Sequence, residues 1–233
     1  EGHADYGASI NNLANNYEGM GMPEKAEPLL LLARSIYEKA LGKGHPNYKK
    51  IRNNLGSMYA ILGQYQKAEE LCLNSLELRK KILGVKHPDY ASSLNRLALI
   101  YKETWQYEKA EPLFEEALEI RKKVLGEDHP DFASSLYNLA LLNRINGKLL
   151  KADSMIQRVI AIRKKLLGIN HPDYAAAISG LGFTRSLRGL HQEAEQLYLQ
   201  ALEIRKNSLG VKSPDYSSTL FDLAKLYSIT GQH

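Results

Sequence analysis

The chain has 233 residues, of which 44% are hydrophobic and 24% are charged, and its formal net charge is +5. This composition is typical of a globular domain. No apolar run approaches the roughly 18 residues that a membrane-spanning helix requires, so we expect no membrane span. The single cysteine, Cys72, excludes an intramolecular disulfide framework and favours a reducing, cytoplasmic location.

The sequence repeats itself with a period of 42 residues. Leucine, alanine and glycine each return at this interval, as in Leu13, Leu55, Leu97, Leu139, Leu181 and Leu223. Such a period indicates a repeat array in which each unit packs against its neighbours. We predict repeats at residues 1–42, 43–84, 85–126, 127–168 and 169–210 and a half repeat at 211–233, forming one solenoid over residues 1–233. Because both ends are in phase with the repeat, we expect a fragment of a longer protein.

Each repeat is predicted to form two antiparallel helices. In residues 87–126, apolar side chains recur at spacings of three and four in two separate stretches. The first helix begins at the His-Pro-Asp of residues 87–89 and ends near Glu103, and a turn at residues 104–107 reverses the chain. The second helix has acidic residues early and basic residues late, which suits the helix dipole. We expect Gly126 to end it in a left-handed conformation.

The third, fourth and fifth repeats depart from the shared pattern. Trp105 replaces a turn glycine that the other repeats have as Gly21, Gly63, Gly147, Gly189 and Gly231. This tryptophan could anchor an interface, but we favour a surface position in which it is partly covered. Asn143 and Arg185 replace the tyrosine of the other first helices. Gly180 and Gly182 lie inside a predicted helix at a cost of about 1 kcal/mol each, so that helix is either locally weak or closely approached by a neighbour.

The recurring histidines are predicted to be helix N-caps. They occupy one equivalent site, as His3, His45, His87, His129 and His171. Neighbouring copies lie about 10 Å apart at helix packing distances and cannot share a metal ion. The sixth copy is Ser213, a residue that caps helices through its side-chain oxygen. The sequence also has no glycine-rich phosphate loop, paired histidines or nucleophile elbow, so we expect no enzyme activity, metal or cofactor.

Basic residues gather at the ends of the second helices and define a predicted basic ridge. Its members are Arg79, Lys80, Lys81, Arg121, Lys122, Lys123, Arg163, Lys164, Lys165, Arg205 and Lys206. These charges suit the negative ends of helix dipoles and favour solubility. They could also contact nucleic acid. We favour the first interpretation because no aromatic side chains that could stack on bases lie among them.

The spacing of several residues resembles a known repeat family. Residues Leu97, Ala98, Tyr101, Tyr107, Ala110, Phe114 and Ala117 reproduce the tetratricopeptide repeat pattern. The motifs HPD, KAEPL and LEIRKKVLG, at a 42-residue period, resemble the repeats of kinesin light chain. This resemblance implies an all-α, right-handed superhelical solenoid of antiparallel helix pairs with about five and a half repeats. It also implies that the first helices line a concave groove that binds peptides.

Helical spacing identifies the side chains that the first helices would present to such a groove. The predicted groove residues are Asn11, Asn12, Asn15, Lys50, Asn53, Asn54, Asn95, Arg96, Leu99, Lys102, Tyr137, Asn138, Leu141, Arg144, Phe183 and Phe221. The asparagines form a ladder whose amides offer both donors and acceptors to an extended peptide, or else a solvated polar face. The later half is apolar with basic neighbours, which favours a partner with aromatic and acidic residues.

We therefore predict a non-catalytic scaffold that binds a protein or peptide in its groove. One alternative is a regulatory or sensor array of a larger effector, such as a caspase-like protease or a nucleotide-switch ATPase. A second, less favoured alternative is nucleic-acid binding through the basic ridge. Homo-oligomers through the terminal repeats are a further expectation.

Overall fold

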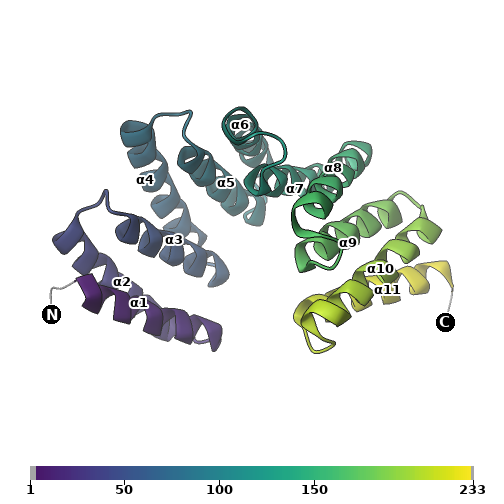
Figure 1. Cartoon of the computed structure of the whole chain (residues 1–233), viewed down its shortest axis with the longest axis horizontal. Coiled ribbons are helices and arrows are strands. Elements are labelled where there is room, and N and C mark those ends of the chain that lie inside the picture. Colours follow the sequence, from purple (N-terminus) through teal and green to yellow (C-terminus); the bar gives the residue numbers. More distant parts are fainter. Residues whose placement is uncertain (1–3, 232–233) are drawn as a thin grey trace. The chain divides into compact units, whose positions relative to one another are not determined.

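The computed structural model describes residues 4–231, and within this range the chain forms eleven α-helices and no strands. Their bounds are α1 (Ala4–Gly19), α2 (Pro23–Leu41), α3 (Pro46–Ile61), α4 (Tyr65–Leu83), α5 (Pro88–Glu103), α6 (Tyr107–Leu125), α7 (Pro130–Ile145), α8 (Leu149–Leu167), α9 (Pro172–Leu187), α10 (His191–Leu209) and α11 (Pro214–Thr230). Successive helices pair in antiparallel fashion (Figure 1). The predicted all-α architecture of repeated helix pairs is confirmed.

The chain divides into two compact units, residues 1–84 with α1 to α4 and residues 85–233 with α5 to α11. The division falls at the predicted boundary between the second and third repeats. That the two units continue as one solenoid over residues 1–233 stays a prediction.

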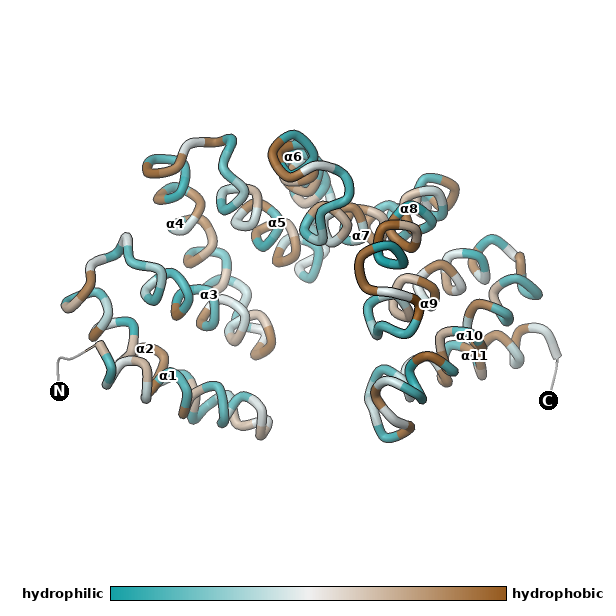
Figure 2. The backbone as a smooth tube through the Cα atoms, viewed as in Figure 1, coloured by the Kyte–Doolittle hydropathy of each residue, from teal (hydrophilic) through white to brown (hydrophobic). Residues whose placement is uncertain are grey.

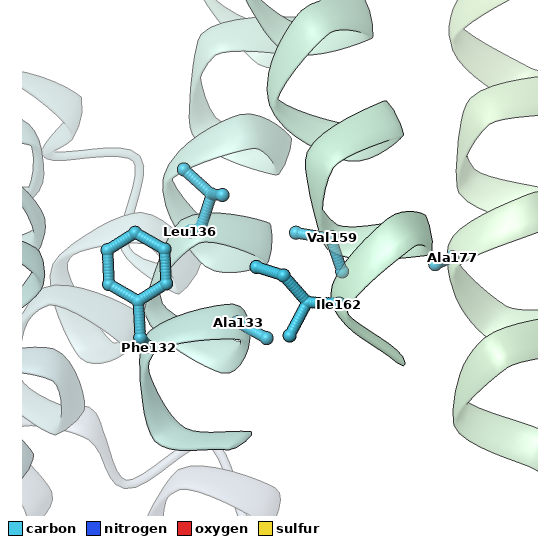
Figure 3. Close-up of a cluster of buried hydrophobic side chains, with 6 residues drawn as sticks. All are labelled: Phe132, Ala133, Leu136, Val159, Ile162 and Ala177. Atoms are coloured by element: carbon cyan, nitrogen blue, oxygen red, sulfur yellow. The ribbon is translucent and has the colours of Figure 1, made fainter. Parts of the chain in front are cut away.

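The helices are amphipathic, and Figure 2 shows hydrophobic and hydrophilic positions alternating along each of them. One alanine of every second helix has no solvent exposure, in Ala26, Ala68, Ala110, Ala152 and Ala194. Four residues later the equivalent core position varies in size and is at most 2% exposed, in Leu30, Cys72, Phe114, Ile156 and Tyr198. Cys72 is therefore a core residue. Figure 3 shows one core cluster, in which Phe132 and Leu136 of α7 lie near Val159 of α8.

Each first helix from α3 onward begins at a side-chain cap. The Nδ1 atoms of His45, His87, His129 and His171 accept the backbone N–H two residues later at 3.1 to 3.2 Å. The hydroxyl of Ser213 accepts the same bond at 3.2 Å. The predicted N-cap role is confirmed for these five residues, whereas His3 lies outside the described range.

The glycines that end the second helices differ in one angle from our prediction. Gly42, Gly84, Gly126, Gly168 and Gly210 have φ of 79° to 84°, as expected for left-handed backbone, but their ψ angles are 161° to 170°. This pair of φ and ψ angles lies outside the left-handed helical region, and essentially only glycine adopts it. The chain therefore leaves each second helix extended, directed toward the next first helix.

One substitution at the tyrosine site of the first helices is matched by a change on the preceding second helix. Tyr59 donates to Glu27 at 3.0 Å, and this bond joins α3 to α2. On α9 the tyrosine is replaced by Arg185, and the buried residue that faces it on α8 is Asp153 rather than glutamate. Arg185 Nε lies 3.4 Å from Asp153, and Arg188 binds the same carboxylate. An ion pair thus replaces the hydrogen bond at this contact.

The caps provide a first test. Replacing His129 with alanine should destabilise the chain by about 1 kcal/mol, because the N–H of Asp131 loses its acceptor. Replacing His129 with serine should leave stability nearly unchanged, since Ser213 has this role in the sixth repeat. Urea unfolding followed by circular dichroism measures both. Equal losses in the two variants would mean that the imidazole has another structural role.

Candidate interaction surface

The predicted groove residues lie on the first helices, α1 and α3 in the first unit and α5, α7, α9 and α11 in the second. We call their solvent side the first-helix face of each unit. Four predicted residues are exposed, namely Asn12, Asn15, Lys50 and Phe221. Asn11 is buried, and the others are half-buried: Asn53, Asn54, Asn95, Arg96, Leu99, Lys102, Tyr137, Asn138, Leu141, Arg144 and Phe183.

The first-helix face of the first unit contains a small hollow of about 130 Å³. It is lined by Ala8, Asn11, Asn12, Tyr37, Asn47, Lys50 and Ile51, so three predicted groove residues from α1 and α3 meet there. Beside it, Asn54 Nδ2 lies 3.2 Å from Asn11 Oδ1 and 3.3 Å from Asn15 Oδ1. The hollow therefore combines a hydrogen-bonded amide cluster with the exposed side chains of Asn12 and Lys50.

The asparagine ladder is partly satisfied within the protein. In the second unit Asn138 Nδ2 donates to Asn95 Oδ1 at 3.3 Å, as Asn54 donates to Asn11 in the first. Asn11 offers little to a ligand, because this residue is 6% exposed and its side-chain oxygen already accepts a hydrogen bond. An asparagine side chain has two donors and two lone pairs, so the more exposed members retain capacity for a ligand.

Much of the predicted apolar half is covered within the second unit. The hydroxyl of Tyr137 donates to the carbonyl of Ala176 at 3.1 Å, and its ring packs over Gly180. The guanidinium of Arg144 lies 4.6 Å from the centre of the Phe183 ring and donates to the Gly180 carbonyl at 3.4 Å. The close approach to Gly180 that its sequence context predicted is confirmed. Tyr137 is a packing residue between α7 and α9.

Gly182 is also closely approached, and the reason is a large neighbour in the core. A Cβ atom at Gly182 would lie 3.1 Å from the ring of Tyr198, the largest residue at its core position. The glycine accommodates the tyrosine in a close-packed interior.

Charged groups border the remaining open part of this face. Phe221 on α11 is 60% exposed, and Lys225 Nζ lies 4.4 Å from the centre of its ring. Burial lowers the pKa of Arg144 and raises the pKa of Asp222, and each of these two charges opposes the shift in the other. This end of the second unit thus combines an open aromatic side chain with positive and negative charge.

Three arginines of the predicted basic ridge, Arg79, Arg121 and Arg205, are buried rather than exposed. Arg121 is 6% exposed, donates to the carbonyl of Asp131 at 3.0 Å and to Ser135 at 2.6 Å, and reaches Ser92 at 3.0 Å. Arg205 is 7% exposed and makes the equivalent bond to the carbonyl of Asp215 at 2.7 Å. These arginines join a second helix to the next first helix. The arginine recurs in the second to fifth repeats, but the lysine that follows it recurs equally, so the sequence alone did not separate the buried arginine from the exposed lysine.

Several lysines of the ridge are paired with carboxylates. Lys122 lies 2.9 Å from Glu127, and Lys123 lies 2.9 Å from Glu119. Lys165 lies 2.5 Å from Asp128. The positive charge expected to attract phosphates is therefore partly neutralised in the second unit.

Trp105 is 80% exposed, so the prediction that it would be partly covered is wrong. Its φ angle is 62°, the one positive value for a non-glycine residue among residues 4–231. The five equivalent glycines have φ of 70° to 78°. An L-residue in this region carries a cost of roughly 1–2 kcal/mol. The turn imposes its geometry on a residue poorly suited to it.

Residues 4–231 hold no group of three or more histidine, cysteine, aspartate or glutamate side chains that could bind a metal ion. In the same range no helix has both the length and the apolar character that a membrane crossing needs.

Comparison with known proteins connects this geometry to a family. A family model described as "Tetratricopeptide repeat" matches residues 5–70, 50–123, 105–165, 131–207 and 173–233. No curated protein sequence matches the chain significantly.

Solved structures resemble the chain over most of its length. One is a crystal structure from Podosopora anserina of TPR-like repeats that are nearly identical to one another, in a protein provisionally named a kinesin light chain. It shares 29% identity with this chain at a TM-score of 0.68, and the match covers 89% of this chain and 98% of that one. BtubC from P. vanneervenii shares 28% identity with a TM-score of 0.73, covering 88% of this chain and 83% of that one. The signal transduction ATPase with a tetratricopeptide repeat sensor from Pyrococcus horikoshii is similar in fold at 19% identity and a TM-score of 0.67, covering 96% of this chain and 33% of that one.

The contact between Tyr137 and Gly180 can be tested by a double-mutant cycle. Replacing Gly180 with alanine should destabilise the second unit by about 1–3 kcal/mol despite alanine's higher helix propensity, because its Cβ would lie 2.5 Å from the Tyr137 hydroxyl. Replacing Tyr137 with phenylalanine in that background should recover part of the loss. Urea unfolding of the four proteins gives the coupling energy, and additive effects would contradict the proposed clash.

Proposed function

The chain belongs to the tetratricopeptide repeat family, and we propose that it is a non-catalytic interaction module that binds a segment of a protein partner on its first-helix face. Arrays of this family are typically protein interaction modules, and their stacked helices offer an extended surface for a ligand. No catalytic motif stands out in the sequence. A cytoplasmic location is part of the proposal, in keeping with the buried Cys72, which forms no disulfide.

The hollow between α1 and α3 is the observation that carries this proposal. It brings Asn12, Lys50 and the edge of the amide cluster together on two consecutive first helices. An extended peptide needs donors and acceptors for its backbone, and amide side chains supply both. The exposed ammonium of Lys50 would favour a carboxylate on the bound segment.

The second unit supports a partner that also carries an apolar side chain. Phe221 is open to solvent, and Arg144 lies beside Phe183. Aromatic residues and arginines are enriched among the side chains that dominate binding energy. We therefore expect a bound segment with acidic residues and at least one aromatic or aliphatic residue.

Binding can be tested with a displayed peptide library. Peptides selected against the full chain should be enriched in acidic residues and should bind the Lys50→Glu variant at least tenfold more weakly, since the exposed charge is reversed. The Asn12→Ala variant should bind severalfold more weakly. Lys80→Glu, an exposed change on the second helix α4, is the matched control and should have no effect. Fluorescence anisotropy measures the affinities, and equal losses in the Lys50 and Lys80 variants would argue against the first-helix face.

The basic ridge gives a separate prediction. Generic single- and double-stranded oligonucleotides should bind only weakly, even at low salt. Three of the four ridge arginines are buried, and several ridge lysines are paired with carboxylates. Anisotropy across a salt titration measures this. A steep decrease of submicromolar affinity with rising salt would restore nucleic-acid binding as a function.

A further inference from the structure

The third repeat presents an exposed tryptophan on a strained turn. Trp105 lies between α5 and α6 with 80% of its surface exposed and a φ angle of 62°. Glycine would fit this backbone without strain, as it does in the equivalent turns of the second unit at Gly147, Gly189 and Gly231. The Trp105 ring lies near Tyr107, with ring centres 6.1 Å apart, and most of its surface is open to solvent. Strain of this kind, unexplained by packing, indicates a functional position.

The opposite end of the same helix pair carries an apolar pocket. It has a volume of about 270 Å³ and is formed by the loop before α5 and the second half of α6. Its lining residues are Val85, Lys86, Glu116, Glu119, Ile120, Lys123 and Val124. Val85 and Val124 are 44% and 50% exposed. The pocket is thus lined by aliphatic side chains together with charged ones.

The fourth repeat shows how the chain can close this position. Residues Glu127, Asp128, Arg158 and Lys165 occupy the sites of Val85, Lys86, Glu116 and Lys123. There Glu127 pairs with Arg158, and Asp128 pairs with Lys165, so two ion pairs span the equivalent surface. The third repeat has no such pairs at these sites, because Val85 is neutral and Lys86 and Lys123 have the same charge.

Trp105 cannot fill the pocket of its own molecule. The helix α6 runs without interruption from Tyr107, beside the tryptophan, to Val124, in the pocket. Seventeen helical steps separate them by about 25 Å. Any contact between the two must therefore join different molecules.

The charges around the two features are also complementary. Glu108 and Lys109 follow the tryptophan turn, and both are exposed. Lys86 and Glu116, both exposed, lie at the pocket rim. Each side thus carries one acidic and one basic group that can pair with its opposite on the other side.

We propose that Trp105 of one copy inserts into the Val85, Ile120 and Val124 pocket of a second copy. Because the two contact surfaces differ, the association is head-to-tail, and it can continue to a third copy and beyond unless a ring closes. It uses the ends of the third repeat and leaves the first-helix face available, so it goes beyond the proposed peptide binding.

Analytical ultracentrifugation of the full chain tests this proposal. Wild-type protein should show mass that increases with concentration beyond a dimer. The Trp105→Gly variant has the glycine that the other repeats have at this turn, and it should associate at least tenfold more weakly. It should also have a higher unfolding midpoint, because glycine relieves the backbone strain. The triple variant Val85→Glu, Lys86→Asp, Glu116→Arg copies the fourth repeat into the pocket and should also remain monomeric. Circular dichroism confirms that each variant is folded.

A mixture of the two variants is the decisive measurement. The Trp105→Gly protein keeps the pocket and the triple variant keeps the tryptophan, so together they should form a 1:1 dimer and no larger species. A monomeric wild type at all concentrations, continued association of either variant alone, or a mixture that stays monomeric would each overturn the proposal. Peptide binding on the first-helix face should be the same in all these variants, so failure of one proposal can be distinguished from failure of the other.

Discussion

The stacking of the repeats in the second unit depends on guanidinium groups that join each second helix to the first helix that follows it, from Arg121, Arg163 and Arg205. In the second unit Arg121 of α6 binds the carbonyl of Asp131 and the hydroxyl of Ser135 on α7, and it also reaches Ser92 on α5. Burial lowers its pKa, and the Asp131 charge opposes this shift. The planar guanidinium has five donors, so one side chain can satisfy groups on two helices at once. This contact fixes the step from one repeat to the next.

The fixed step determines what the first-helix face can offer. Because adjacent first helices lie at a set spacing, amides on them come within hydrogen-bond distance, as Asn138 and Asn95 do in the second unit. The same residues therefore stabilise the stack and make its surface polar. Asn12 and Lys50 are more exposed than the amide pairs, and they border a hollow into which a peptide group could fit. The capacity for binding is thus greatest at side chains such as Asn12 and Lys50, which remain exposed to solvent.

The sequence period predicted the helix pairs, their caps and the repeated buried positions, because equivalent residues make equivalent contacts in each repeat. It failed where a side chain's role depends on the neighbouring repeat. Arg121 looked like a surface charge because its acceptors are ten or more residues away on another helix. Asn11 looked free because its partner, Asn54, lies one repeat further along the chain. The exposure of Trp105 depends on the absence of neighbours, which no local pattern records.

Some differences among the repeats are compensated by contacts within the chain, and others are not. Arg185 replaces tyrosine where Asp153 replaces glutamate, and Gly182 lies where Tyr198 fills the core. In each case two departures from the repeat fit each other, so packing accounts for both. Trp105 differs because no second substitution relieves its backbone angle, and its contact with Tyr107 leaves the side chain largely exposed. A departure that costs stability and has no partner inside the chain is best explained by a partner outside it.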